Sequence, residues 1–184
     1  MRKAAAVAAL LLALPTGALA REVAGVPLQD TVDLGGKPLT LNGAGTRKKL
    51  WIEVYVGALY LATPSSDANA ILAADEPKLV RMVFRRDVDQ KSIMGAFREG
   101  FEANSGAEAV TLVPQLDKIA PAIGDVKKGG EITVAYVPGT GAVVTGPKGT
   151  ATVEGKAFAD ALFRNWLGRK PADDDLKRRM LGKK

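Results

Sequence analysis

Histidine and cysteine are both missing from the 184 residues. Their absence excludes Ser-His-Asp and Cys-His nucleophilic sites, zinc sites built on His or Cys, haem held by His, and thiol redox chemistry. It also excludes disulfides as a source of stability. Carboxylates remain as metal ligands, but the acidic cluster Asp173–Asp175 begins a predicted helix, where the oxygens point in different directions around the axis. We therefore predict no metal site, no catalytic residue and no cofactor.

Nucleotide-binding loops and nucleic-acid surfaces are also missing. Gly43-Ala44-Gly45 has Lys48 where a dinucleotide fingerprint needs its third glycine, and Gly141 to Lys148 lacks the Gly-Lys-Ser/Thr ending of a P-loop. The formal net charge is only +6. The basic residues concentrate near the C-terminus, where Asp173–Asp175 offset them, so a solvated helix face accounts for them better than a nucleic-acid surface.

The first twenty residues resemble a targeting segment. Arg2 and Lys3 form a basic start, Ala4 to Leu14 an apolar run, and Ala18-Leu19-Ala20 a small-x-small cleavage site. The run is too short for a membrane span, which needs about 20 apolar residues, and no later segment approaches that length. We predict a signal peptide at residues 1–20, no integral membrane segment after its removal, and a periplasmic or secreted domain at residues 21–184.

Strand patterns and helix patterns are segregated along the rest of the chain. Strands are predicted first, helices in the middle, then a three-strand meander with turns rich in glycine and proline, and finally helices. This order predicts an α+β open-faced sandwich, with a large antiparallel β-sheet and helices layered on one face. The predicted ranges are a hairpin over 21–41, strands near 50–61, 78–86, 131–137, 142–145 and 150–154, and helices over 65–74, 87–103, 107–123 (in two pieces), 156–167 and 173–181.

The stretch from Leu41 to Leu61 combines a predicted glycine-rich loop, three consecutive cations and a long strand. Alternation places the even-numbered residues from Leu50 to Tyr60 on one face, which has the pattern of a core side. The opposite face is apolar but also carries a carboxylate, a phenol and a glycine: Trp51, Glu53, Tyr55, Gly57, Leu59 and Leu61. Two interpretations remain open for this face, namely the wall of a pocket and an ordinary central strand buried on both sides.

Arginine 47 is the candidate anchor for a ligand. Its planar guanidinium stays charged and donates two parallel hydrogen bonds, which suits a carboxylate or a phenolate, and a tyrosine hydroxyl could supply a third donor. The competing interpretation is a surface cation in a loop beside Lys48 and Lys49.

The same stretch resembles the chalcone isomerase superfamily. The shared elements are Gly43-Ala44-Gly45-Thr46-Arg47, followed by a long strand that ends in Tyr60-Leu61. The order of strands and helices from about residue 22 to the C-terminus also fits. Val54-Tyr55-Val56 is more similar to the fatty-acid-binding and bacterial chalcone-isomerase-like branches than to the plant enzymes.

The resemblance implies specific roles for three residues. Plant enzymes of the family use the loop arginine with hydroxyls from a strand threonine and a helix tyrosine; Arg47 matches the arginine, whereas Tyr55 stands at the threonine position and Phe97 at the tyrosine position. Phenylalanine cannot donate the hydrogen bond that stabilises developing negative charge. The fatty-acid-binding branch holds a carboxylate with an arginine and a strand tyrosine, which Arg47 and Tyr55 fit.

We therefore predict a non-catalytic carrier of a fatty acid or similar amphipathic carboxylate, with Arg47, Tyr55 and Phe97 as ligand-binding residues. Phe101 and Trp166 are further helix residues that could line an alkyl tunnel, although core packing is the stronger interpretation for both. Two alternatives stay open: an intramolecular lyase or isomerase of the chalcone isomerase type, and a protein-interaction module whose pocket is filled by side chains.

Overall fold

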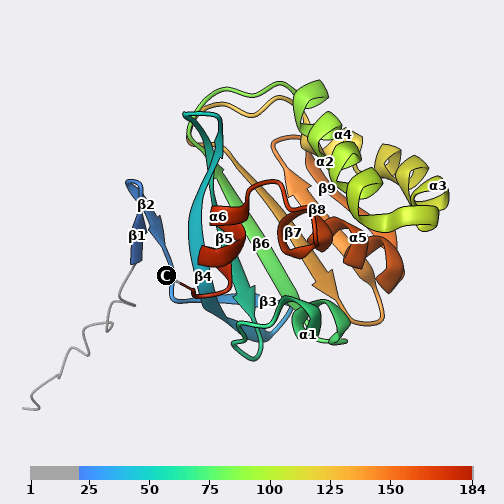
Figure 1. Ribbon diagram of the computed structural model, residues 1–184, viewed down its shortest axis with the longest axis horizontal. Coiled ribbons are helices and arrows are strands. Elements are labelled where there is room, and N and C mark those ends of the chain that lie inside the picture. Colours follow the sequence, from blue (N-terminus) through green and yellow to red (C-terminus); the bar gives the residue numbers. More distant parts are fainter. Residues whose placement is uncertain (1–20, 184) are drawn as a thin grey trace, which may run out of the picture.

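A computed structural model describes residues 21–183, so the predicted signal segment at 1–20 lies outside the described residues (Figure 1). Seven strands form one antiparallel sheet in the order in which they occur along the chain, β3 to β9, and β1 and β2 form a separate hairpin. The strands are β1 Arg21–Val23, β2 Val26–Leu28, β3 Thr31–Leu34, β4 Lys37–Lys49, β5 Ile52–Leu61, β6 Lys78–Phe84, β7 Glu131–Val137, β8 Gly141–Gly146 and β9 Gly149–Glu154. The helices are α1 Ala68–Ala73, α2 Gln90–Ser105, α3 Ala109–Leu112, α4 Ala120–Ile123, α5 Lys156–Leu167 and α6 Asp174–Met180, with 3₁₀ helices η1 Gly106–Glu108 and η2 Val113–Lys118.

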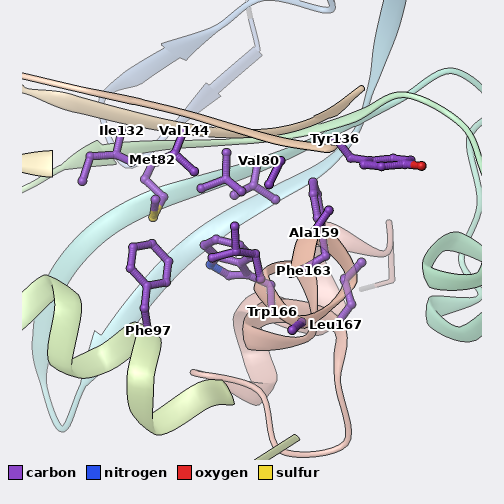
Figure 2. Packing of buried hydrophobic residues seen from close by; sticks show 14 of the residues in the cluster. Val80, Met82, Phe97, Ile132, Tyr136, Val144, Ala159, Phe163, Trp166 and Leu167 are labelled. Carbon is purple, nitrogen blue, oxygen red and sulfur yellow. The ribbon is translucent and has the colours of Figure 1, made fainter. Parts of the chain in front are cut away.

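The helices cover one face of the sheet, which confirms the predicted α+β open-faced sandwich (Figure 1). The main core lies between that face and helices α2 and α5. Val80, Met82, Ile132 and Val144 point down from the strands, and Phe97 from α2 and Trp166 from α5 point up toward them (Figure 2). A smaller core on the opposite face joins the β1–β2 hairpin to β4, β5 and β6. Both faces of β5 are therefore buried along most of its length.

Aspartate caps explain where three of the predicted helices begin. The side chains of Asp67, Asp89 and Asp173 accept hydrogen bonds from backbone N–H groups in the first turns of α1, α2 and α6, respectively. Such caps satisfy donors that have no partner within the helix. The predicted helical region 107–123 is a series of short α and 3₁₀ pieces, and Pro114 and Pro121 each stand in the first positions of one piece.

The stretch 41–61 differs from its prediction in two places. The predicted loop before residue 50 is the second half of strand β4, which pairs with β5 from Thr40 to Lys49. The chain turns instead at Leu50 and Trp51, which join β4 to β5 and lie almost entirely in solvent. The prediction that Leu50 faces a core is therefore wrong, and neither interpretation of the opposite face, a pocket wall or a buried strand, holds for Trp51. The alternating pattern continues through the turn because Leu50 and Trp51 are apolar, although neither residue lies in a strand.

Candidate ligand-binding site

The glycine motif lies in strand β4, and its alternation determines where Arg47 is placed. Gly43, Gly45 and Arg47 stand on the helix-facing side of the sheet, where Gly45 is opposite Gly57 and Arg47 is opposite Tyr55 of β5. A bulge between Leu41 and Gly43 precedes this run. The prediction of a loop was wrong because these glycines serve close packing rather than a turn.

Helix α6 occupies the space that the glycines leave free. A Cβ atom at Gly43 would lie 2.1 Å from the backbone carbonyl oxygen of Arg179, and one at Gly57 would lie 2.8 Å from Cε of Met180. Only glycine permits such an approach of a helix to a strand. Arg47 is the next residue on this face beyond the glycines. The backbone N–H of its neighbour Lys48 donates to the capping carboxylate of α6 over 2.9 Å.

A cavity of about 60 Å³ begins at Arg47 and extends between the sheet and helices α2 and α5. Its walls are mostly apolar, and three strands, two helices and the segment after α5 contribute to them. The lining residues are Arg47, Val54, Tyr55, Met82, Phe84, Val88, Ser92, Ile93, Ala96, Phe97, Asn165, Trp166 and Ala172. The three predicted site residues, Arg47, Tyr55 and Phe97, therefore line the same cavity.

Arg47 is the cationic side chain of this lining, and it has no anionic partner within residues 21–183. Its Nε–H is buried without a hydrogen-bond acceptor among residues 21–183, and it belongs to none of the ion pairs found there. Its guanidinium carbon lies 5.8 Å from the centroid of the Tyr55 ring, within the range of a cation–π contact. A half-buried guanidinium that lacks a carboxylate leaves donors available to an anion.

Tyr55 presents its hydroxyl group inside the protein. The hydroxyl oxygen accepts a hydrogen bond from Nε1 of Trp166 over 2.8 Å. Burial raises the pKa of Tyr55, and the nearby charge of Arg47 and the Trp166 hydrogen bond oppose this only in part. The phenol is therefore protonated at neutral pH, and its hydrogen can be donated to an acceptor in the cavity.

Phe97 forms part of an aromatic wall. Its ring meets Trp166 edge-on, with centroids 6.1 Å apart and planes at 80°, and both residues approach Met82 of the sheet (Figure 2). Tyr55 and Phe84 continue the wall with centroids 5.7 Å apart. Such tilted and edge-on arrangements are the favoured geometries of aromatic pairs. The wall provides apolar surface and, at Phe97, no hydroxyl group.

A second, more polar hollow of about 280 Å³ adjoins the cavity on the side of Lys170. It lies between α2 and the segment that follows α5, and it shares Arg47, Ala96, Asn165 and Ala172 with the inner cavity. Glu99 and Lys170 give its walls charge of both signs. Arg47 thus stands between an apolar interior and a polar opening.

Sequence reasoning undervalued Trp166 and considered Phe101 as a tunnel residue. Trp166 lines the cavity and holds the Tyr55 hydroxyl, whereas Phe101 is fully buried against Phe158, with ring centroids 5.4 Å apart, away from the lining. Asn165 was not predicted at all. Its amide donates to backbone oxygens of its own helix. Both α2 and α5 have an apolar stripe, and the spacing of the residues in a stripe does not indicate which side chains face a cavity.

The acidic side chains of residues 21–183 are dispersed or engaged in other contacts. No group of three or more Asp or Glu side chains is placed to hold a metal ion in this part of the chain. Asp173 caps α6, and Asp175 pairs with Arg178 and Arg179. None of the helices described is long and apolar enough to cross a membrane.

The chain belongs to the chalcone isomerase-like family, whose model matches residues 20–182. Among solved structures, the crystal structure of a fatty-acid binding protein from Arabidopsis thaliana has a similar fold, with a TM-score of 0.68. The two sequences are 16% identical, and the match covers 85% of this chain and 92% of that one. A comparison with curated proteins finds none that matches. The resemblance stated from the glycine motif is thereby confirmed at the level of family and fold.

Proposed function

We propose that the protein binds a fatty acid or a similar amphipathic carboxylate without transforming it. The carboxylate lies against the Arg47 guanidinium and the Tyr55 hydroxyl, and the hydrocarbon chain extends along the aromatic wall. The observation that carries this proposal is the unpaired cation at an otherwise apolar cavity. A poorly hydrated charge without a partner is costly, so the site gains most from a ligand that brings the missing anion. The name of the similar Arabidopsis protein, a fatty-acid binding protein, supports the same ligand class.

The size of the cavity limits how a long ligand enters. A volume of about 60 Å³ accommodates only a few water molecules, whereas pockets for drug-sized ligands span about 300–1,000 Å³. We infer that this small cavity holds the carboxylate end of the ligand and that an acyl chain separates α2 from the sheet. Met82 and Phe97 meet across that boundary, and the unbranched Met82 side chain can change rotamer easily.

Native mass spectrometry of protein purified from its own compartment tests the ligand class directly. We expect a retained mass that corresponds to an acyl carboxylate and that is released by organic extraction. Titration calorimetry with a long-chain acid and with the alcohol of the same length supplies the control, because the alcohol lacks the anion that Arg47 would bind. Equal affinity for the acid and the alcohol would contradict an anchoring role for Arg47.

We also propose that the protein is exported, with cleavage after Ala20. The support is the sequence pattern of residues 1–20, which lie outside the described residues. N-terminal sequencing of the periplasmic or secreted form should give Arg21 as the first residue. A mature pool that retains Met1 would contradict export by this route.

A further inference from the structure

The tip of the β4–β5 hairpin exposes apolar side chains that neither the cores nor the proposed cavity use. Among residues 21–183, the four large hydrophobic residues that stand in solvent are Leu50, Trp51, Ile52 and Val110, and the first three are consecutive. Leu50 is 79% exposed and Trp51 is 81% exposed. Exposed apolar residues that occur singly need no explanation, but a cluster on a protruding turn does.

The backbone at the tip is unusual for the residue that it carries. Lys49 pairs with Ile52, so Leu50 and Trp51 form a two-residue hairpin turn, and Leu50 has a φ of 59°. Glycine normally fills a hairpin position with positive φ, because a side chain there is strained. A leucine at this position sacrifices some stability and contributes nothing to either core. The local strain is therefore consistent with a function for the exposed side chain.

The charges at the tip are mainly positive. Lys48 and Lys49 are exposed, directly precede the turn and form none of the ion pairs found among residues 21–183. Directly after the neighbouring strand β6, the backbone N–H of Arg85 donates to the carbonyl of Val54, which brings the exposed Arg86 to the same end of the sheet.

Several acidic residues lie near Lys48. Glu53 stands opposite it in the strand pairing and faces Arg85 at 3.7 Å, Asp173 accepts a hydrogen bond from its backbone N–H, and Glu22 and Asp175 line a hollow with it. Neither Lys48 nor Lys49 forms an ion pair among residues 21–183, so both ammonium groups remain available beside the apolar side chains.

We propose that this tip, residues 48–52, docks on a membrane surface that contains anionic lipid. Leu50, Trp51 and Ile52 enter the headgroup region, where tryptophan is favoured, and the lysines remain at the level of the lipid phosphates. A protein partner is a poorer match, because a stable protein interface needs about 800 Å² on each side, whereas a hairpin tip presents only a few side chains. The proposal does not depend on acid binding, since Leu50 and Trp51 do not line the cavity.

The location of the tip relates it to the candidate site. Val54 and Tyr55 line the cavity, and Trp51 precedes Val54 by three strand residues, a distance of about 10 Å along the hairpin. In Figure 1 the tip forms the protruding end of β4 and β5 at the edge of the molecule, beside the loop that leads into α2. Docking through the tip would bring the side of the protein that carries Arg47 close to the lipid.

Vesicle flotation with the protein that begins at Arg21, the mature form proposed above, tests the proposal, using phosphatidylcholine vesicles with and without phosphatidylglycerol. We expect binding to the anionic vesicles that weakens as salt is added. Leu50→Ser combined with Trp51→Ser should reduce it about tenfold or more, because the buried apolar area is lost. Lys48→Glu combined with Lys49→Glu should reduce it at least as strongly, since each lysine near an anionic surface contributes about a fivefold factor.

Matched controls and a second readout make the outcome decisive. Val110→Ser and Lys118→Glu alter an exposed apolar residue and an exposed cation elsewhere and should leave binding unchanged. Trp51 emission should shift to shorter wavelength on vesicles, whereas Trp166 is already buried and Trp51→Phe should abolish the shift. Undiminished binding by the Leu50 and Trp51 double variant would overturn the proposal, and so would the absence of a Trp51 emission shift on anionic vesicles. Absence of binding to any anionic vesicle would overturn it as well.

Discussion

Arg47 is the residue on which acid binding should depend most. A charge-assisted hydrogen bond contributes about 1.5–3 kcal/mol, so Arg47→Ala should raise the dissociation constant of a long-chain acid about 10- to 150-fold. Arg47→Lys should also bind more weakly, because an ammonium group cannot offer two parallel donors. Titration calorimetry measures both effects.

The same substitution should cost little stability. The guanidinium forms no ion pair among residues 21–183, so its removal breaks none, and we expect the free energy of unfolding to change by about 1 kcal/mol or less. Arg98→Ala is the matched control, because Arg98 is exposed on α2 and does not line the cavity. Unchanged acid affinity in Arg47→Ala would remove the arginine from the proposed site.

At the scale of single residues, the sequence predicted the polar anchor better than the rest of the lining. Arg47 and Tyr55 could be selected because a short motif fixes both positions, and strand pairing places them directly opposite each other. Trp166 could not be selected, because its contact with the Tyr55 hydroxyl joins residues 111 positions apart. Such a contact depends on how α5 lies over the sheet, which local periodicity does not contain.

The packing of helix α6 on the sheet should be disrupted by a side chain at Gly43 of β4 and should tolerate one at Gly57 of β5. A methyl group at Gly43 would collide with backbone oxygen atoms of Arg179 and Met180, which cannot move without displacing the helix. At Gly57 the nearest atom is the flexible end of Met180. We expect Gly43→Ala to lower the free energy of unfolding by about 2–3 kcal/mol and Gly57→Ala by about 1 kcal/mol or less.

Denaturant unfolding distinguishes these two cases. Gly95→Ala is the control, because a Cβ there meets nothing within 4 Å and alanine favours a helix interior. Gly43→Ala should also weaken acid binding, since the α6 cap at Asp173 holds the backbone beside Arg47 through Lys48. Equal stability of the Gly43 and Gly57 variants would contradict the close packing of α6.

Helix α1 is tied to the sheet by a buried lysine. Nζ of Lys78 donates to the carbonyl oxygens of Ile71 and Ala74 over 2.8 and 2.9 Å, at the carboxyl end of the helix. Burial, and after it the charge of Lys156, lowers the pKa of Lys78 from its ordinary value of 10.5 to about 8, while the nearby acids oppose the shift. These acids are Asp160, Asp75 and Glu76.

The lowered pKa of Lys78 predicts how stability changes with pH. Between pH 8 and 10.5 the unfolded chain holds a proton that the folded chain has released, so this group makes the free energy of unfolding rise with pH across that window. The effect should be measured up to pH 10, because the raised pKa of Tyr136, about 12, lowers stability beyond that point. Lys78→Met should flatten the rise between pH 8 and 10, whereas exposed Lys118→Met should preserve it. A wild-type profile as flat as that of Lys78→Met would contradict the shift.

At the scale of elements, the sequence predicts the number and type of most strands and helices. The exceptions are the second half of β4 and the turn that joins it to β5. The second half of strand β4 is predicted as a loop because glycines usually mark turns, whereas its first half falls in the predicted hairpin over 21–41. Here the glycines match the space that α6 needs, and α6 lies more than 130 residues further along the chain. Conversely, Leu50 and Trp51 were predicted to lie in a strand because their apolar side chains fit the alternation. In both cases a distant helix or the surrounding solvent, rather than local sequence, decides the outcome.

For the molecule as a whole, the proposed ligand site and the proposed membrane contact lie at the same end of the sheet, near Arg47. The cavity lies between the sheet and helices α2 and α5, the polar hollow opens beside Lys170, and strand β4 continues from Arg47, which lines both, to the hairpin tip. If an acyl chain enters between the sheet and α2, affinity should rise with chain length until the opened space is full. Each buried methylene should contribute at most about 0.8 kcal/mol, or about fourfold in dissociation constant. A calorimetric series of saturated acids measures this slope, and affinity independent of chain length would contradict apolar burial.

The final prediction separates a carrier from an enzyme. Wild-type protein should not cyclise a chalcone above the spontaneous rate, because Phe97 contributes no hydroxyl group to the cavity where the plant enzymes use a tyrosine. Phe97→Tyr combined with Tyr55→Thr recreates around Arg47 the donor set that the plant enzymes use, and any acceleration should appear first in this variant. The loss of chalcone absorbance follows the reaction, with Arg47→Ala added to the double variant as the control that should abolish it. Robust turnover by the wild type would reject the carrier function and make Tyr55 the hydroxyl donor.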